Sequence, residues 1–306
     1  MNCKLLLPVA AASLLLAGCA HKPFNEAEYS YNPNHSRAWN LCTMMNNGYY
    51  WDVSDVKAPK EYSGGADGSI ALSSFGWAGG FHSAAGSGFL PGTTNWGLGL
   101  GIGLGLSLLQ SALTPPDPEE RNWLVTYLPA DKAGTAVEAQ KAFLKSWTDA
   151  FAKSARAAYP DSDLKIEEVH GQNGKIIKVL YFVDHNIGCY GWKELKDMKE
   201  YGLAKRCQIE FAAYPALGYG TVESVPMLNL QKPSWRMRSA YFSFIGGDDQ
   251  NIDFLKIITN ANKDFPDYSY VYLTTRRNPD GNKNPPMVLE KDKVNFFIRP
   301  SSVNTK

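Results

Sequence analysis

The sequence has few of the residues from which catalytic and metal sites are built. Five cysteines and five histidines are scattered over 306 residues, and none has the close Cys/His spacing of a zinc site. Phosphate-binding loops, the HExxH pattern and the dinucleotide-binding fingerprint are absent as well. We therefore expect no catalytic site, no bound metal and no cofactor.

The chain also lacks an excess of charge of either sign. Its 31 lysine and arginine residues balance 30 aspartate and glutamate residues, so the formal net charge is +1. A balanced chain offers no electrostatic attraction for a polyanion, which argues against nucleic acid as a partner. Aromatic residues make up 12% of the chain, enough for a substantial core, and this excludes global disorder.

Charge is missing altogether from one long internal segment. The 49 residues from Gly68 to Pro116 contain no Asp, Glu, Lys or Arg. Two apolar pieces lie within this uncharged segment, Ile70 to Phe81 and Trp96 to Leu113. The second piece has glycine at every second position, here called the glycine repeat: Gly97, Gly99, Gly101, Gly103 and Gly105.

Three structures are compatible with the glycine repeat. As a helix, its GxxxG spacing allows close helix packing in a membrane, and residues 96–113 would rise about 27 Å, near the hydrocarbon thickness. As a strand, it has the length of a membrane strand, but open strand edges are not tolerated in lipid, so either several chains must assemble or the strand must pair with Ile70–Phe81. As a buried loop, it packs against a soluble domain. The absence of charge favours a membrane-contacting, self-associating segment, and we expect a homo-oligomer.

The N-terminus has the layout of a secretory signal. Lys4 precedes an apolar run from Leu5 to Leu16, and small residues follow. The run is too short for a membrane-spanning helix and ends in a cleavable pattern, so residues 1–18 are predicted to be removed on export.

The end of this signal, Leu16-Ala17-Gly18-Cys19, resembles the lipobox of bacterial lipoproteins. The resemblance implies cleavage before Cys19, a diacylglyceryl group on its sulfur and an acyl chain such as palmitate on its amine. Several acyl chains anchor a protein stably in a membrane, so lipid is an expected partner. Ala20, in place of aspartate, implies sorting to the outer membrane. Residues 19–35 then form a lipidated tether.

The lipobox followed by the glycine repeat resembles, in layout, the glycine-zipper outer-membrane lipoproteins, which include the TraT-type surface-exclusion proteins of conjugative plasmids. This resemblance implies an oligomer in or on the outer membrane. The predicted function is a structural, non-catalytic subunit of an envelope complex of the secretion, conjugation or exclusion type, with other envelope proteins as further partners. The alternative is a lipid-anchored periplasmic binding module or hydrolase that acts on peptidoglycan or glycan.

Three cysteines remain after Cys3 leaves with the signal and Cys19 takes lipid. Disulfides persist in the compartments to which exported proteins go, but three thiols cannot all pair within one chain, and spacing alone does not fix the pair. We favour Cys189–Cys207, because both flank predicted strands on either side of a polar loop. Cys42 lies in a helical pattern and is interpreted as a buried residue.

The periodicity of apolar residues predicts an α+β fold with a largely antiparallel sheet. A short helix is expected at 36–47 within an aromatic N-terminal region, 36–67. In a soluble domain, 119–306, Thr135 and Glu138 have the form of a capping box and begin a long amphipathic helix, 135–158. A shorter helix is expected at 252–262. Strands are predicted at 164–170 and 175–183, which flank Gly171-Gln172-Asn173-Gly174, a hairpin signal with Asn-Gly at its turn. Further strands are predicted at 207–214, 235–245, 268–274 and 294–299.

A few residues have side chains suited to catalysis or ligand binding, but their sequence context indicates structural roles. Ser87 stands between two glycines but lacks the strand and helix of a nucleophile elbow. Asp248 and Asp249 lack the spaced oxygen ligands of a calcium loop and are interpreted as a turn. His185, beside Asp184, is interpreted as a surface or hydrogen-bonded residue. An aromatic group that could bind a glycan is interpreted as packing around the disulfide: Tyr190, Trp192 and Tyr201.

Overall fold

The computed structural model describes residues 31–46, 55–58, 68–71, 122–190, 206–215, 221–222, 225–245, 252–274 and 285–300. Cys19 and the whole glycine repeat, Gly97 to Gly105, lie outside the described residues. So do Ser87, Asp248, Asp249, Trp192 and Tyr201.

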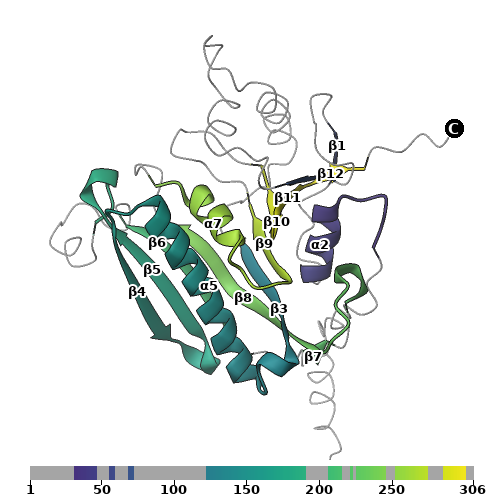
Figure 1. The fold of residues 1–306 in the computed structure, drawn as a ribbon, viewed down its shortest axis with the longest axis horizontal. Helices are drawn as coiled ribbons and strands as arrows, with labels where there is room; N and C mark the ends of the chain where they lie inside the picture. Colours follow the sequence, from purple (N-terminus) through teal and green to yellow (C-terminus); the bar gives the residue numbers. More distant parts are fainter. Residues whose placement is uncertain are drawn as a thin grey trace, which may run out of the picture.

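The predicted α+β fold with a largely antiparallel sheet is confirmed (Figure 1). Every pairing in a sheet of ten described strands is antiparallel, and the parallel pair β1 (Val56–Lys57) and β12 (Ile298–Arg299) stands apart. The large sheet runs in the order β2 (Ser69–Ala71), β11 (Lys293–Phe296), β10 (Met287–Glu290), β9 (Ser269–Leu273), β3 (Trp123–Pro129), β8 (Ser234–Ile245), β6 (Cys207–Ala213), β5 (Ile176–Val183) and β4 (Asp163–His170), with β7 (Thr221–Val222) paired to β8.

Strand β8 joins the two halves of this sheet. Its 12 residues pair with β3 over 234–238 and with β6, on the other edge, over 239–245. The register with β6 shifts between Ala212 and Ala213, and such a bulge bends the strand and increases its twist. One strand therefore carries the sheet from the β3 half to the β4 half.

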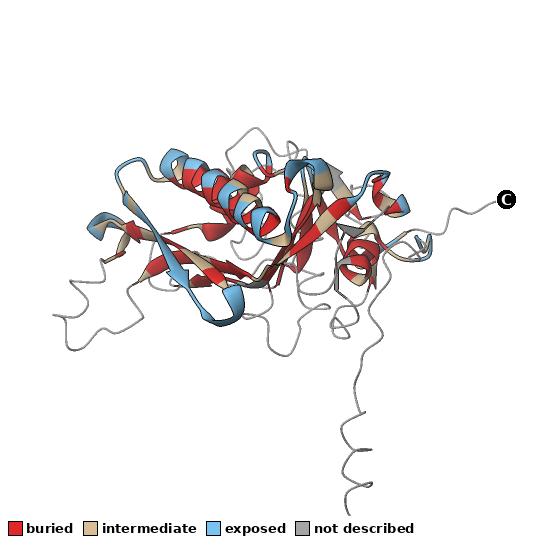
Figure 2. Cartoon of the chain, turned by 90° about the horizontal axis from the view of Figure 1, so that it is seen from below, coloured by how far each residue is buried: buried red, intermediate tan, exposed pale blue. Residues whose placement is uncertain are grey.

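The long helix α5 (Ala136–Ala158) covers one face of the sheet (Figures 1 and 2). Thr135 caps it as predicted, with both hydrogen bonds of the capping box to Glu138 present. Buried aromatic rings on α5 pack on strand residues, for example Phe151 against Phe211 and Phe242. The second helix, α7 (Phe254–Asn262), lies beside α5, so the main core lies between these two helices and the sheet.

The N-terminal helix α2 (Arg37–Asn46) lies on the opposite face of the sheet. Thr126 contacts α5 and pairs with Ser269 of β9, whereas Glu290 contacts α2 and pairs with Tyr270 of β9. Because adjacent residues of a strand point to opposite faces, the two helices cover different sides. The described parts of 36–71 thus add a helix and a strand, β2, to the sheet formed by 122–300.

Candidate functional site

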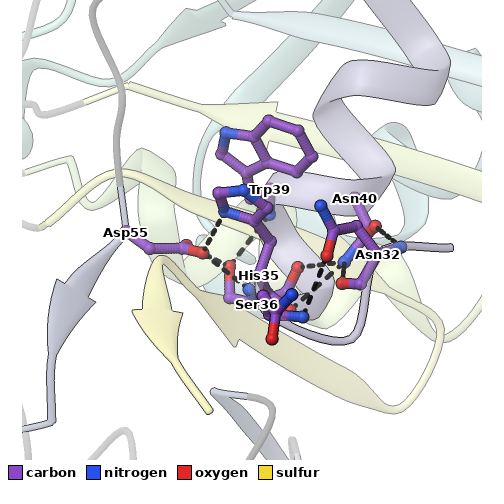
Figure 3. A network of polar contacts seen from close by, with 7 residues as sticks. Asn32, His35, Ser36, Trp39, Asn40 and Asp55 are labelled. Atoms are coloured by element: carbon purple, nitrogen blue, oxygen red, sulfur yellow. Dashed lines mark hydrogen bonds and ion pairs between the residues drawn. The ribbon is translucent and has the colours of Figure 1, made fainter.

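A buried carboxylate organises the polar contacts where the chain enters α2 (Figure 3). The Asp55 side chain has no solvent exposure. Its Oδ2 accepts the Ser36 backbone N–H at 2.7 Å and lies 3.1 Å from His35 Nδ1. Its Oδ1 accepts the Ser36 hydroxyl at 2.5 Å. One carboxylate therefore holds two consecutive residues of the chain, and we call this the Asp55 cluster (residues 32, 35, 36, 39, 40 and 55).

Ser36 occupies the N-cap position of α2. Its Oγ accepts the Trp39 backbone N–H at 3.0 Å, which satisfies one of the free donors of a helix start. Asn40, one turn into the helix, donates from Nδ2 to the backbone carbonyls of residues 32, 35 and 36 and accepts the Asn32 N–H at 2.8 Å. These bonds fold the segment before the helix back onto its first turn.

The His35 ring stacks on Trp39, with the ring centroids 3.8 Å apart and the planes 15° from parallel. The His35 side chain is 29% exposed, in contrast to the Asp55 carboxylate. The aromatic pair therefore lies on the solvent side of the Asp55 cluster and covers the buried carboxylate.

The order of these contacts differs from that of a nucleophilic triad. In such a triad the histidine lies between serine and aspartate and removes the serine proton. Here the aspartate lies between the other two: Ser36 donates to Asp55, and His35 contacts Asp55 rather than the hydroxyl. The Ser36 oxygen also accepts a bond from the helix. The arrangement positions a helix start and does not activate a nucleophile.

A second contact fixes α2 to the sheet. The Arg37 guanidinium binds the Glu290 carboxylate through two bonds, Nε to Oε2 at 2.6 Å and Nη2 to Oε1 at 2.5 Å. Asn295 Nδ2 donates to the same carboxylate at 3.3 Å. Both partners are about four-fifths buried, and a two-pronged pair of this kind has a defined geometry. It joins residues 253 positions apart.

Cys42 lies buried in α2 with a free thiol. Burial, and to a lesser extent the Asp55 charge, raises the pKa of the Cys42 thiol well above its usual value. The thiolate is the reactive form of cysteine, so the thiol stays protonated and unreactive at neutral pH. This agrees with the interpretation of Cys42 as a packing residue.

The structure joins Cys189 and Cys207 in a disulfide, the pairing that the sequence analysis favours, with 5.4 Å between their Cα atoms. Both residues are buried. The bond links the end of the turn that follows β5 to the first residue of β6.

His185 begins a short 3-10 turn, and its ring stacks on Tyr190 with 4.8 Å between centroids. The neighbouring Asp184 carboxylate accepts the Asn186 N–H at 2.9 Å and the Ser162 hydroxyl at 3.0 Å. The aspartate therefore caps this turn, in agreement with the structural role that the sequence analysis assigns to His185.

Within the residues that the structure describes, no three His, Cys, Asp or Glu side chains gather closely enough to hold a metal ion. Among the described helices, none combines the length and the apolar character needed to cross a bilayer. Comparison of the chain with protein-family models, curated proteins and solved structures finds no match.

Sequence reasoning placed the start of α2 at Ser36 but missed the Asp55 cluster. Asp55 follows 19 residues after Ser36, outside any helix-start pattern, and Arg37 and Glu290 are further apart still. Within this cluster, the only local sequence signal was Ser36, a residue type that favours the start of a helix.

Proposed function

We propose that this protein is an outer-membrane lipoprotein with a structural, non-catalytic role, anchored through acylated Cys19 and self-associating as a subunit of an envelope complex. The lipobox residues support the anchor, and the glycine repeat supports self-association. The Cys189–Cys207 disulfide supports export, because such bonds persist outside the cytosol.

The lipobox that ends at Cys19 is the observation that carries this proposal, and the attachment of α2 to the sheet indicates where a tether from that residue would meet the fold. The first described residue, Tyr31, follows Cys19 by 31 − 19 = 12 positions, and the Asp55 cluster begins at the next residue, Asn32. A fully extended chain spans at most ~3.6 Å per residue, so 12 residues reach about 40 Å. An acylated Cys19 would therefore hold the folded domain close to the bilayer, and a pull on the tether would act on the sheet through α2.

Replacing the acylated residue tests the anchor. The Cys19→Ala variant of the full chain should be lost from the outer-membrane fraction, because no acyl chain remains to anchor it there. Fractionation followed by immunoblotting measures this, and Cys42→Ala, which removes a cysteine not predicted to carry lipid, is the matched control. A Cys19→Ala chain still found entirely in the outer membrane would contradict anchoring through this residue.

Light scattering of the acylated chain in mild detergent, with the detergent mass subtracted, tests self-association. We expect a defined multiple of the monomer mass and a smaller particle for Gly101→Leu/Gly105→Leu, because the added side chains would prevent close approach along the glycine repeat. Gly86→Leu/Gly88→Leu adds the same two side chains elsewhere in the uncharged segment and should leave the mass unchanged. A monomeric wild-type particle would refute this part of the proposal and favour a lipid-anchored binding module.

A further inference from the structure

Strand β4 forms one end of the ten-stranded sheet and is exposed along its length (Figures 1 and 2). Seven of its eight residues are exposed, including the apolar Ile166 and Val169 at 41% and 46%. One edge pairs with β5, and the other edge has no strand partner among the described residues. An open edge of this length is a template for pairing with another strand.

The pairing with β5 determines which backbone groups of β4 point outward. Just beyond the strand, Gly171 donates to the Lys175 carbonyl at 2.8 Å, so this pair is hydrogen-bonded. In antiparallel strands, bonded and non-bonded pairs alternate. Residues 169, 167 and 165 therefore bond to β5, whereas residues between them direct their N–H and C=O groups away from the sheet: Leu164, Ile166 and Glu168.

We propose that β4 pairs antiparallel with β4 of a second copy of this chain, about a two-fold axis that runs perpendicular to the sheet, midway between the two Ile166 residues. Ile166 then lies opposite Ile166 of the second copy, Lys165 opposite its Glu167, and Leu164 opposite its Glu168. The outward groups of residues 164, 166 and 168 meet each other and form about six backbone hydrogen bonds. This contact involves other residues than the glycine repeat and goes beyond the proposed function.

The charges of β4 select this register over its neighbours. An axis one residue earlier would place Lys165 against Lys165 and Asp163 against Glu167. An axis one residue later would place Glu167 against Glu167. Like charges directly opposite each other destabilise a strand pair, whereas opposite charges stabilise it. Of these three axes, only the one at Ile166 converts these side chains into two Lys–Glu pairs. An axis at Leu164 would pair Lys165 with Asp163, but only the axis at Ile166 also brings together two exposed isoleucines.

The contacts of the isolated chain do not prevent this pairing. Lys165 Nζ lies 3.1 Å from Asp163 Oδ2, but both side chains are about 60% exposed, and such surface pairs contribute little. Glu168 contacts Lys178 at 2.5 Å and His170 at 2.9 Å, and in the proposed register it lies opposite Leu164 rather than a charge. Glu167 also bonds the Tyr181 side chain of β5, a contact within the same subunit that leaves its charge available to Lys165 of the second copy.

Disulfide trapping in the full acylated chain tests the register. In Ile166→Cys, the two new cysteines would face each other across the axis with Cα atoms about 5.5 Å apart, within disulfide range. Val169 is an apolar residue on the same strand with similar exposure. In Val169→Cys, each new cysteine would lie opposite Asp163 of the second copy, far from the new cysteine of that copy. On oxidation we expect a covalent dimer for Ile166→Cys and none for Val169→Cys. Equal yields from both variants, or no dimer from Ile166→Cys, would overturn the proposal.

Charge reversal tests the same contact without a covalent bond. Lys165→Glu and Glu167→Lys each replace two opposite-charge pairs with like-charge pairs and should each lower the Ile166→Cys dimer yield about tenfold. The double variant Lys165→Glu/Glu167→Lys restores opposite charges and should restore the dimer, which a folding defect would not do. Failure of this rescue would refute the register.

All the trapping variants are also made in the Gly101→Leu/Gly105→Leu background, which removes the proposed contact through the glycine repeat. Trapping that persists there shows that the β4 contact is independent, even if the proposed role of the glycine repeat fails. Trapping that depends on the glycine repeat would refute a specific β4 pairing.

Discussion

Trp147→Ala is expected to destabilise the fold by about 3–5 kcal/mol, the range measured when large aromatic side chains are removed from a core. Trp147 is fully buried at the centre of α5. Its ring lies 3.9 Å from Phe265 and 6.0 Å from both Phe143 and Phe151, centroid to centroid. Urea unfolding followed by far-ultraviolet circular dichroism would show the loss as a lower midpoint.

A second variant separates packing from hydrogen bonding at this site. Trp147 Nε1 donates to Thr126 Oγ1 at 2.9 Å, and Thr126 in turn contacts the Ser269 hydroxyl at 2.9 Å. Trp147→Phe keeps an aromatic ring but removes the donor, so it should cost less than Trp147→Ala. Val137→Ala, on the same helix but 48% exposed, should change stability by less than about 0.5 kcal/mol. A loss below about 1 kcal/mol in Trp147→Ala would contradict the central place of this residue in the core.

Breaking the Cys189–Cys207 disulfide is expected to cost about 3 kcal/mol. The bond closes a loop with a sequence separation of 18, and cross-links of this span restrict the unfolded chain by about that amount. The double variant Cys189→Ala/Cys207→Ala should therefore unfold at a lower urea concentration than the oxidised wild type.

Reductant provides the control for this prediction. Wild type and Cys42→Ala should both lose stability when the disulfide is reduced, because both proteins contain the Cys189–Cys207 bond. The double variant should be insensitive to reductant, since Cys42, the free cysteine among the described residues, is buried and in no disulfide. Thiol titration shows whether the bond has been reduced. If the reduced wild type is as stable as the oxidised wild type, the bond has no stabilising role.

Elements with strong local signals could be predicted from the sequence. The capping box at Thr135 and the amphipathic spacing after it gave α5 within one residue of its observed start. The hairpin of β4 and β5 was indicated by Asn173-Gly174, and both residues have the positive φ angles that such a turn requires, 57° and 71°. The preference for Cys189–Cys207 rested on the strands expected beside both cysteines, and β6 does begin at Cys207.

Strands that are buried on both faces, or that are very short, were not predicted from the sequence. β3 is buried at its first five residues on either face, so it lacks the alternation by which a half-buried strand is recognised. β10 has only four residues. The predicted strand 294–299 divides into β11 and β12, because its two ends pair with different partners, β10 and β1.

By itself, then, the sequence determined the α+β class, the long helix and the hairpin, because these follow from contacts or patterns within a few residues. Only the tertiary structure decided that α2 lies on the face opposite α5, that Asp55 holds Ser36 and that Arg37 binds Glu290. It also decided that β4 lies at one end of the sheet, with no strand partner on its outer edge among the described residues. Each of these depends on where distant segments meet in space, and no local pattern of residues encodes a distance across the fold.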